Sequence, residues 1–312
     1  MESRCLERCN DMFNPQAKLL HHAENVAEWL ATDRTIPVLF EIAPTGYCNA
    51  SCPWCLFKNK RSTAQISREI MLKTIEDIKM LGSEALNWTG GGEPVLHPHF
   101  SEFVALAADE GLKQGLFTNG YQKIPHQNVF SWIRISLTDK PYENIIIPDV
   151  PFGICLNQLP KHTKKDLIKI CLEAREIGAR YFQVRPALQT SYKKQTLMLA
   201  PDYLKEYRTD KFDVYVTDYK YEEANKPKTY RDCYGYHFCP SIDWRGRLLT
   251  CLYMTNQNKF VFGDLNKKPL LRIWGGIAKK VPVVEACQNC CKNHEINKVL
   301  YAAKNIGLAD FL

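Results

Sequence analysis

Hydrophobic positions along this chain follow two periods that alternate in blocks. From about residue 17 to residue 32 they recur every three or four residues, which predicts an amphipathic helix. Beyond residue 38, short apolar runs of strand length alternate with longer segments that keep the helical period. Such alternation is typical of βα units around a parallel sheet. The apolar stripe of the first helix comprises Leu19, Leu20, Ala23, Val26, Ala27 and Leu30.

Six strands are expected, at about residues 38–43, 85–89, 114–118, 132–137, 152–157 and 181–185. One clear helix follows the first strand and ends at Gly82, a suitable C-cap. Another, over about residues 164–177, begins where Thr163 and Asp166 suit a capping box. Six βα units are fewer than the eight of a closed barrel. The sequence therefore predicts an α/β fold, a partial (β/α)6 barrel of the TIM type with an open side for substrate.

The composition changes after the sixth strand. Residues 201–218 are predicted to form a helix and a strand, and a charged, proline-containing link follows to about residue 231. Six of the 13 cysteines lie beyond that link. We therefore expect a helical lead-in over residues 1–35, the barrel over residues 36–225, and a smaller domain with a C-terminal helix over residues 226–312.

Overall composition narrows the class of protein. Of 312 residues, 45% are hydrophobic and 24% are charged, which suits a globular protein with a large core. The N-terminus lacks an export signal and no apolar run is long enough for a bilayer span, so we expect a cytoplasmic protein without a membrane partner. The formal net charge is +7. We attribute it to a lysine-rich solvated surface, which permits an anionic substrate, and we expect no nucleic-acid partner.

Three cysteines, Cys48, Cys52 and Cys55, follow the first apolar strand with the spacing C-x3-C-x2-C. Closely spaced cysteines in a chain without an export signal favour metal sites over disulfides. Three thiolates on one loop can hold three irons of a four-iron cluster and leave the fourth iron open to substrate or cofactor atoms. A zinc knuckle would need two separated cysteine pairs or a histidine. The alternatives are ordinary core or surface cysteines and a zinc ligand set.

With the aromatic residue Trp54 before its third cysteine, the loop resembles the signature of the radical S-adenosylmethionine (radical SAM) superfamily. This resemblance implies that a [4Fe–4S] cluster on Cys48, Cys52 and Cys55 binds SAM, with Trp54 among the cofactor contacts. It also implies reductive cleavage of SAM to a 5′-deoxyadenosyl radical that abstracts hydrogen from the substrate. A reductant such as flavodoxin or ferredoxin would supply the electron.

Two further motifs follow the next two strands. Gly91, Gly92 and Glu93 resemble the GGE motif of the superfamily, which implies contact with the amino group of SAM; a tight turn capped by Glu93 is the alternative. The third strand ends in a TNG sequence similar to one seen in relatives, so Asn119 is a predicted cofactor contact.

Two strand-end residues are also predicted to contact ligand. Ser136 lies near the C-terminal end of the fourth strand, where barrel sites form, and is the candidate for the SAM carboxylate or ribose. Arg185 lies at the end of the sixth strand and is assigned to SAM or substrate contact, with a possible part in deprotonation. A solvated arginine is the alternative.

A second metal site is predicted near the C-terminus. Cys239 and Cys251 flank a predicted turn between two short strands, and Cys287 and Cys290 form a C-x2-C pair farther along. This arrangement resembles the auxiliary-cluster domain called Twitch, the short relative of the SPASM domain, which implies one auxiliary [4Fe–4S] cluster that relays electrons. The bare spacing also allows a structural zinc site, and Cys291 could replace Cys290.

Cys233 is not needed for that set of four. In radical SAM epimerases a cysteine of this kind returns a hydrogen atom to the substrate radical. The resemblance therefore makes Cys233 a candidate catalytic residue, with simple packing as the alternative.

The resemblance implies a small polar substrate of the cyclitol or sugar type that is dehydrogenated or epimerised. The first alternative is epimerisation or cross-linking of a ribosomally made peptide. Such enzymes often begin with a peptide-binding winged-helix module, for which the 47 residues before Cys48 are too few. The second alternative is a non-catalytic metal-binding scaffold, which the three-cysteine loop and the glycine-acid motif argue against.

Overall fold

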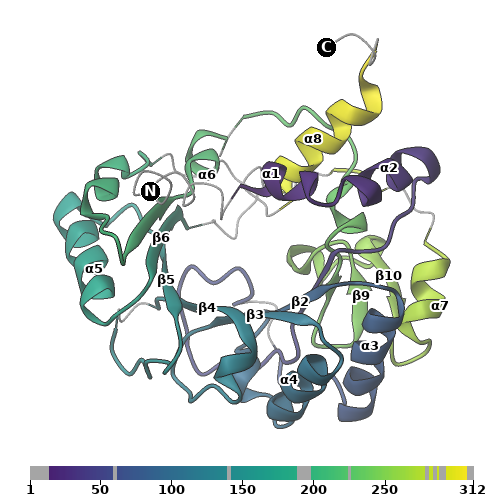
Figure 1. Ribbon diagram of the computed structural model, residues 1–312, viewed down its shortest axis with the longest axis horizontal. Coiled ribbons are helices and arrows are strands. Elements are labelled where there is room, and N and C mark those ends of the chain that lie inside the picture. The colour runs from purple at the N-terminus through teal and green to yellow at the C-terminus, as the bar shows by residue number, and fades with distance from the viewer. Residues whose placement is uncertain are drawn as a thin grey trace.

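One sheet organises the part of the chain that the computed structural model describes, namely residues 14–58, 62–138, 142–187, 198–223, 226–277, 281–283, 287 and 293–307. Its strand order is β10-β9-β8-β1-β2-β3-β4-β5-β6-β7, and the strands follow an arc (Figure 1). The strands are β1 (Leu39–Ile42), β2 (Ala85–Trp88), β3 (Lys113–Thr118), β4 (Phe130–Ser136), β5 (Phe152–Gln158), β6 (Tyr181–Pro186), β7 (Asp213–Val216), β8 (Ser241–Ile242), β9 (Arg247–Leu249) and β10 (Val261–Asp264).

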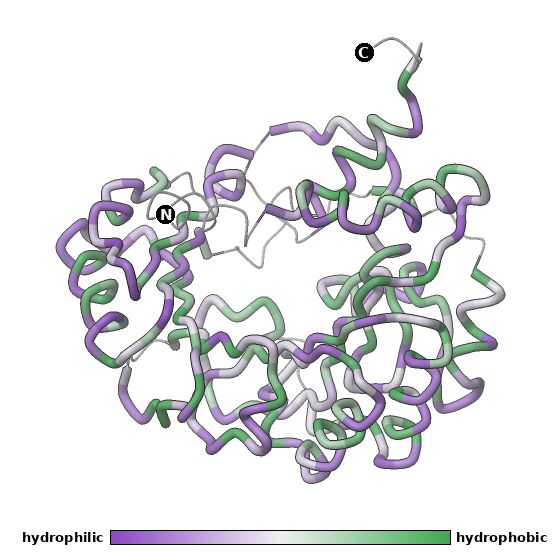
Figure 2. Tube along the Cα trace, viewed as in Figure 1, coloured by the Kyte–Doolittle hydropathy of each residue, from purple (hydrophilic) through white to green (hydrophobic). Residues whose placement is uncertain are grey.

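The helices occupy two positions around this sheet. α3, α4 and α5 lie outside the arc, and hydrophilic and hydrophobic positions alternate around them, as expected of helices with one buried face (Figures 1 and 2). α1 and α2 pack against α8. None of the helices that the structure describes is long and apolar enough to span a membrane. The α-helices are α1 (Pro15–Leu20), α2 (Ala23–Thr32), α3 (Arg68–Met80), α4 (Phe100–Asp109), α5 (Lys164–Glu176), α6 (Asp218–Glu222), α7 (Leu270–Gly275) and α8 (His294–Asn305).

The strands β1 to β7 run parallel and pair in chain order. All six predicted strands are confirmed, and so is the α/β class with a parallel sheet. The count of six is wrong, because β7 adds a seventh parallel strand beside β6. The sequence predicts a strand within residues 201–218. It does not predict that this strand pairs with β6, because that pairing depends on the free edge of β6 in the folded sheet. Within the described residues, no α-helix separates β3 from β4 or β4 from β5, so the βα alternation is incomplete.

Strands of the predicted second domain extend the same sheet. β8 pairs parallel with β1, and β8, β9 and β10 form an antiparallel meander. The predicted turn between β8 and β9 is confirmed: Gly246 has φ of +74°, and the buried Asp243 carboxylate accepts from Nε and Nη2 of Arg247 at 3.1 and 2.6 Å. The domain boundary near residue 226 stays a prediction, while the pairing of β1 with β8 makes the sheet continuous across it.

The expected helix over residues 17–32 is two helices, α1 and α2. The N–H groups of His21 and His22 bond carbonyls three residues back, which tightens the last turn and ends α1. The buried positions also differ from the predicted stripe. Trp29 is fully buried, whereas Leu20 is 73% exposed.

Trp244, in the turn between β8 and β9, packs the meander against the loops that follow β1 and β2. Its indole is fully buried and donates from Nε1 to the Ser62 hydroxyl at 3.1 Å. Phe57 packs edge-on against it, with ring centres 6.0 Å apart. A Cβ added at Gly91 would lie 2.0 Å from the indole, and one at Gly46 would lie 2.8 Å from it. The two glycines therefore make room for the tryptophan.

Trp244→Ala is expected to lower the free energy of unfolding by about 3–5 kcal/mol, the usual loss when a buried tryptophan is truncated. Chemical denaturation followed by circular dichroism measures this change. Met80→Ala is the control, because Met80 is 68% exposed on α3 and its truncation should cost less than about 0.5 kcal/mol. Equal losses in the two variants would contradict the packing role of Trp244.

Candidate functional site

A cavity of about 620 Å³ lies where the parallel strands end. Most of the predicted site residues line it, namely Cys48, Cys52, Trp54, Cys55, Gly91, Gly92, Glu93, Asn119, Ser136, Arg185, Cys239 and Cys251. Cys233 and Cys287 are not among the described residues of its wall, and Cys290 lies outside the described residues. The fold thus brings the cysteine loop, the glycine turn and the C-terminal hairpin to one cavity.

The cysteine loop follows β1 and folds into a tight turn. The N–H of Cys55 bonds the carbonyl of Cys52 at 3.1 Å, and the N–H of Ala50 donates to the Cys48 sulfur at 3.5 Å. All three thiols are half-buried. In the part of the chain that the structure describes, no three Cys, His, Asp or Glu side chains are close enough to hold one metal ion.

The glycine turn after β2 is held against the cysteine loop by its backbone. The N–H of Gly92 bonds the carbonyl of Thr45 at 2.9 Å, and the N–H of Glu93 bonds the carbonyl of Tyr47 at 2.7 Å. A Cβ added at Gly92 would lie 1.8 Å from the Tyr47 oxygen, so only glycine permits this approach. The neighbouring loop thus requires the glycine and fixes the turn beside Cys48.

The Glu93 carboxylate faces the end of β3. Its Oε1 accepts from the Thr118 hydroxyl at 2.7 Å, and its Oε2 accepts from the N–H of Asn119 at 2.7 Å. Glu93 is only 3% exposed, and this burial raises its pKa to about 7, against the lowering effect of the two donors. Glu93 therefore links the ends of β2 and β3 with a carboxyl group that titrates near neutral pH.

Asn119 completes the connection back to the cysteine loop. Its Nδ2 donates to Asn49 Oδ1 at 2.7 Å and lies 3.9 Å from the Cys48 sulfur, while its Oδ1 accepts from the N–H of Tyr121 at 3.0 Å. The ends of β1, β2 and β3 are thereby joined by a closed set of hydrogen bonds. We call this set the loop clamp; it comprises Thr45, Tyr47, Asn49, Gly92, Glu93, Thr118 and Asn119.

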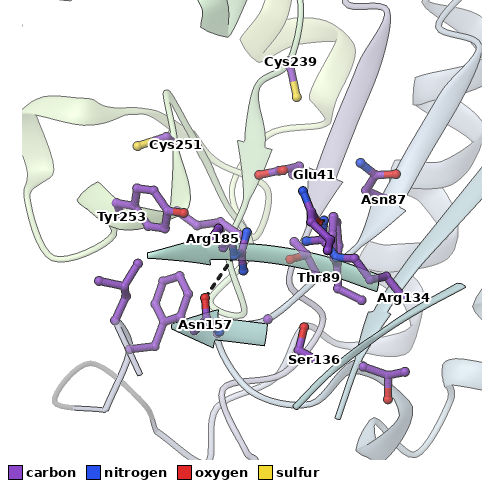
Figure 3. A pocket seen from close by; sticks show the side chains of 18 of the residues that line it. Glu41, Asn87, Thr89, Arg134, Ser136, Asn157, Arg185, Cys239, Cys251 and Tyr253 are labelled. Carbon is purple, nitrogen blue, oxygen red and sulfur yellow. Dashed lines mark hydrogen bonds between the residues drawn. The ribbon is translucent and has the colours of Figure 1, made fainter. Parts of the chain in front are cut away.

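Further polar residues on the parallel strands and on the loops beside them complete the wall, and several have no counterpart among the predicted site residues. They include Glu41, Asn87, Thr89, Arg134, Asn157 and Tyr253 (Figure 3). The predicted contact Arg185 donates from Nε to Asn157 Oδ1 at 3.0 Å. An isolated polar residue in an otherwise apolar parallel strand is the signal that could have identified Glu41, Asn87 and Asn157, because such strands are buried on both faces.

Three of the four predicted ligands of the second metal site lie in the described part of the chain. Cys239 is buried, Cys251 is half-buried, and both line the cavity. Cys287 lies within electrostatic reach of Cys233, whose thiol pKa is raised by burial and further by Cys287. The Cys233 sulfur also accepts from Asn297 Nδ2 at 3.5 Å. Cys233 is therefore associated with a predicted metal ligand and is absent from the described wall of the cavity.

The donor set fits the cofactors that the resemblance implies. Three thiols from one loop line the cavity, and the glycine turn, Asn119 and Ser136 line the same space. A volume of about 620 Å³ falls within the roughly 300–1,000 Å³ typical of small-molecule sites.

Comparison with known proteins agrees with this fold. No protein-family model matches the sequence, and no curated protein matches it. Streptococcus suis SuiB bound to S-adenosylmethionine superposes with a TM-score of 0.60 at 17% identity, over 84% of this chain and 71% of SuiB. SuiB bound to its precursor peptide SuiA gives 0.55 at 17% identity, over 84% and 70%. anSMEcpe with bound AdoMet and the Kp18Cys peptide gives 0.53 at 14% identity, over 85% and 84%. These neighbours are radical SAM enzymes, and at such identities the likeness is one of fold.

Glu93 predicts a pH dependence of stability. The folded chain keeps the Glu93 proton up to about pH 7, whereas the unfolded chain releases it near the ordinary value of 4.5. The contribution of this group to stability should therefore fall by roughly 3 kcal/mol as the pH rises through that window. Glu93→Gln, which keeps the shape of the side chain, should remove this pH-dependent component.

Urea denaturation of the iron-free protein at pH 5 and pH 8 measures the effect as the difference between wild type and Glu93→Gln. Glu176→Gln, at an exposed position in α5, is the control and should follow the wild type at both pH values. A difference between wild type and Glu93→Gln that is the same at pH 5 and pH 8 would contradict a buried Glu93 that titrates near pH 7.

Proposed function

We propose that this chain is a radical SAM enzyme that removes a hydrogen atom from a small polar substrate. The observation that carries the proposal is the loop clamp, which brings the three-cysteine loop, the glycine turn and Asn119 together on one cavity. The fold shared with SuiB and anSMEcpe supports the same assignment. We further propose a cytoplasmic location and a flavodoxin- or ferredoxin-type reductant.

Cys48, Cys52 and Cys55 would hold a [4Fe–4S] cluster. When bound, the cluster and SAM supply a 5′-deoxyadenosyl radical by reductive cleavage of SAM, and that radical abstracts the substrate hydrogen. The residues proposed to bind SAM are Trp54, Gly91, Gly92, Glu93, Asn119 and Ser136. Arg185 is proposed to contact either SAM or the substrate. Glu93 would act through its backbone and by positioning Asn119, because both carboxylate oxygens already accept hydrogen bonds from the end of β3.

The protein surroundings of Cys48 would also influence the electronic properties of the cluster. The N–H of Ala50 donates to the Cys48 sulfur, and Asn119 Nδ2 lies 3.9 Å from it. Such groups stabilise negative charge on a thiolate, and hydrogen bonds to sulfur are among the factors that set the reduction potential of an iron-sulfur cluster. Asn119 therefore has two proposed effects, one on loop geometry and one on cluster potential.

A second [4Fe–4S] cluster, of the Twitch type, would serve as an electron relay, with Cys239, Cys251, Cys287 and Cys290 as its ligands. The position of Cys239 and Cys251 on the cavity wall supports a second metal group near the substrate. Cys233, within electrostatic reach of Cys287, is a candidate to replace Cys290 as the fourth ligand. Its absence from the described wall favours this role over hydrogen return to the substrate.

Dehydrogenation of a cyclitol- or sugar-type molecule is the proposed reaction, with epimerisation as the alternative outcome at the same site. Arg185, on the cavity wall, would assist substrate binding or deprotonation. Modification of a ribosomally made peptide is the second candidate. One observation favours it: SuiB with its precursor peptide and anSMEcpe with a peptide share this fold.

Anaerobic reconstitution should load about eight irons per chain, and dithionite with SAM should then yield 5′-deoxyadenosine, measured by chromatography. Cys52→Ser should retain about four irons and form no 5′-deoxyadenosine. Cys251→Ser should also retain about four irons but still cleave SAM. Cys171→Ala, in the buried face of α5, is the control and should match the wild type. Zinc in place of iron, or SAM cleavage by Cys52→Ser, would refute the assignment.

Cys233→Ala should lower the iron content of the reconstituted protein below that of the wild type, because Cys233 lies within reach of the predicted ligand Cys287. Iron and sulfide analysis measures the change, and 5′-deoxyadenosine formation should persist. An unchanged iron content would speak against the ligand role and return Cys233 to the hydrogen-donor or packing roles.

A further inference from the structure

A buried arginine lines the cavity and has no anionic partner in the part of the chain that the structure describes. Arg134, on β4, is 8% exposed. Its Nη1 donates to Gln183 Oε1 at 2.7 Å, and its guanidinium lies 4.1 Å from the centre of the Phe117 ring. Across the described ranges, Nε of Arg134 has no hydrogen-bond partner and the side chain makes no ion pair.

This arrangement is unfavourable for a structural arginine. Removal of a guanidinium from water is costly, and a neutral amide with one aromatic face offsets the cost only in part. Burial accordingly lowers the pKa of Arg134. An apolar side chain of similar length would fill the same space without the buried charge, so the arginine is better explained by a ligand that reaches it.

A second arginine reaches the same space. Arg185 lies on β6, on the other side of β5, and both side chains extend toward one region of the cavity (Figure 3). Asn157 Oδ1 accepts from Nε of Arg185 and orients its guanidinium. Gln183 Nε2 donates to Thr217 Oγ1 at 3.1 Å, which directs the Gln183 oxygen toward Arg134. Asn157 therefore orients Arg185, and Gln183 orients Arg134.

The two acidic residues of the described wall do not neutralise Arg134. The Glu93 carboxylate bonds Thr118 and the backbone of Asn119, and Glu41 makes no ion pair with Arg134. Arg134 also precedes Ser136 by two residues on β4, which places it about 7 Å farther from the strand end. Arg134 therefore lies deeper along β4 than Ser136, the residue of that strand proposed to bind SAM.

We propose that Arg134 and Arg185 bind a carboxylate group of the substrate. The proposal deepens the proposed function and depends on it for the identity of the cavity as the substrate site. The guanidinium fork matches the two oxygens of a carboxylate, and two forks from strands on either side of β5 can bind one carboxylate in a fixed orientation. The substrate class is then an acidic molecule of the sugar or cyclitol type, one that carries a carboxylate group.

Calorimetric titration of the reconstituted protein with succinate tests this proposal, with succinamide as the neutral analogue at equal ionic strength. The wild type should bind succinate and not succinamide. Arg134→Met should weaken succinate binding by about tenfold or more, because a charge-assisted fork is lost. Without succinate its melting temperature should equal or exceed that of the wild type, since an unpaired buried charge is removed. Arg180→Gln, which removes an exposed charge just before β6, should bind succinate like the wild type.

Three results would overturn the proposal. Equal binding of succinate and succinamide by the wild type would show that no carboxylate site exists. A lower melting temperature in Arg134→Met with unchanged succinate binding would make Arg134 a structural residue. A tenfold loss of SAM affinity in Arg134→Met, measured by equilibrium dialysis, would assign the arginine to the SAM carboxylate. Failure of the proposed function is distinguishable, because it would appear as no 5′-deoxyadenosine from the wild type whatever the succinate result.

Discussion

The contact between the cysteine loop and the glycine turn is the constraint on which the site depends. Only a residue without Cβ permits the approach of Gly92 to the Tyr47 carbonyl, and two backbone hydrogen bonds hold that approach. Glu93 carries the connection to the end of β3, and Asn119 returns it to Asn49 beside Cys48. Three strand ends are thereby fixed relative to one another, so the three thiols face one cavity although they lie on an irregular loop.

The C-terminal segment adds a second anchor to the same arrangement. β8 pairs with β1, and the indole of Trp244 occupies the space left by Gly46 and Gly91. Cys239 and Cys251 reach the cavity because the meander that carries them is part of the sheet. The wall also contains two buried ionisable side chains with different surroundings. Both carboxylate oxygens of Glu93 accept hydrogen bonds from the protein, whereas Arg134 has no anionic partner among the described residues.

Features set by local sequence were the ones that could be predicted. The capping box of Thr163 and Asp166 depends on neighbouring residues and is confirmed. The helix predicted to end at Gly82 has its C-cap one residue earlier, at Leu81, and Gly82 follows with φ of +86°. Strand positions followed from apolar runs, since parallel strands are buried on both faces. Other features could not be predicted, because they depend on residues distant in sequence or on backbone hydrogen bonds. These are the strands that neighbour β7 and β8, the break between α1 and α2, and the direction of the Glu93 carboxylate. From the sequence, Arg134 could be assigned only to the same strand face as Ser136. Its lack of an anionic partner among the described residues depends on how β4, β5 and β6 pack.

Electron–nuclear double resonance of the dithionite-reduced protein tests the central claim most directly, with SAM labelled by nitrogen-15 in its amino group. If the three thiolates leave one iron open to SAM, the reduced cluster should show a hyperfine coupling to that nitrogen, and Cys251→Ser should show the same coupling. A reduced cluster whose spectrum is unaffected by labelled SAM would contradict an open iron in the loop clamp and with it the radical SAM assignment.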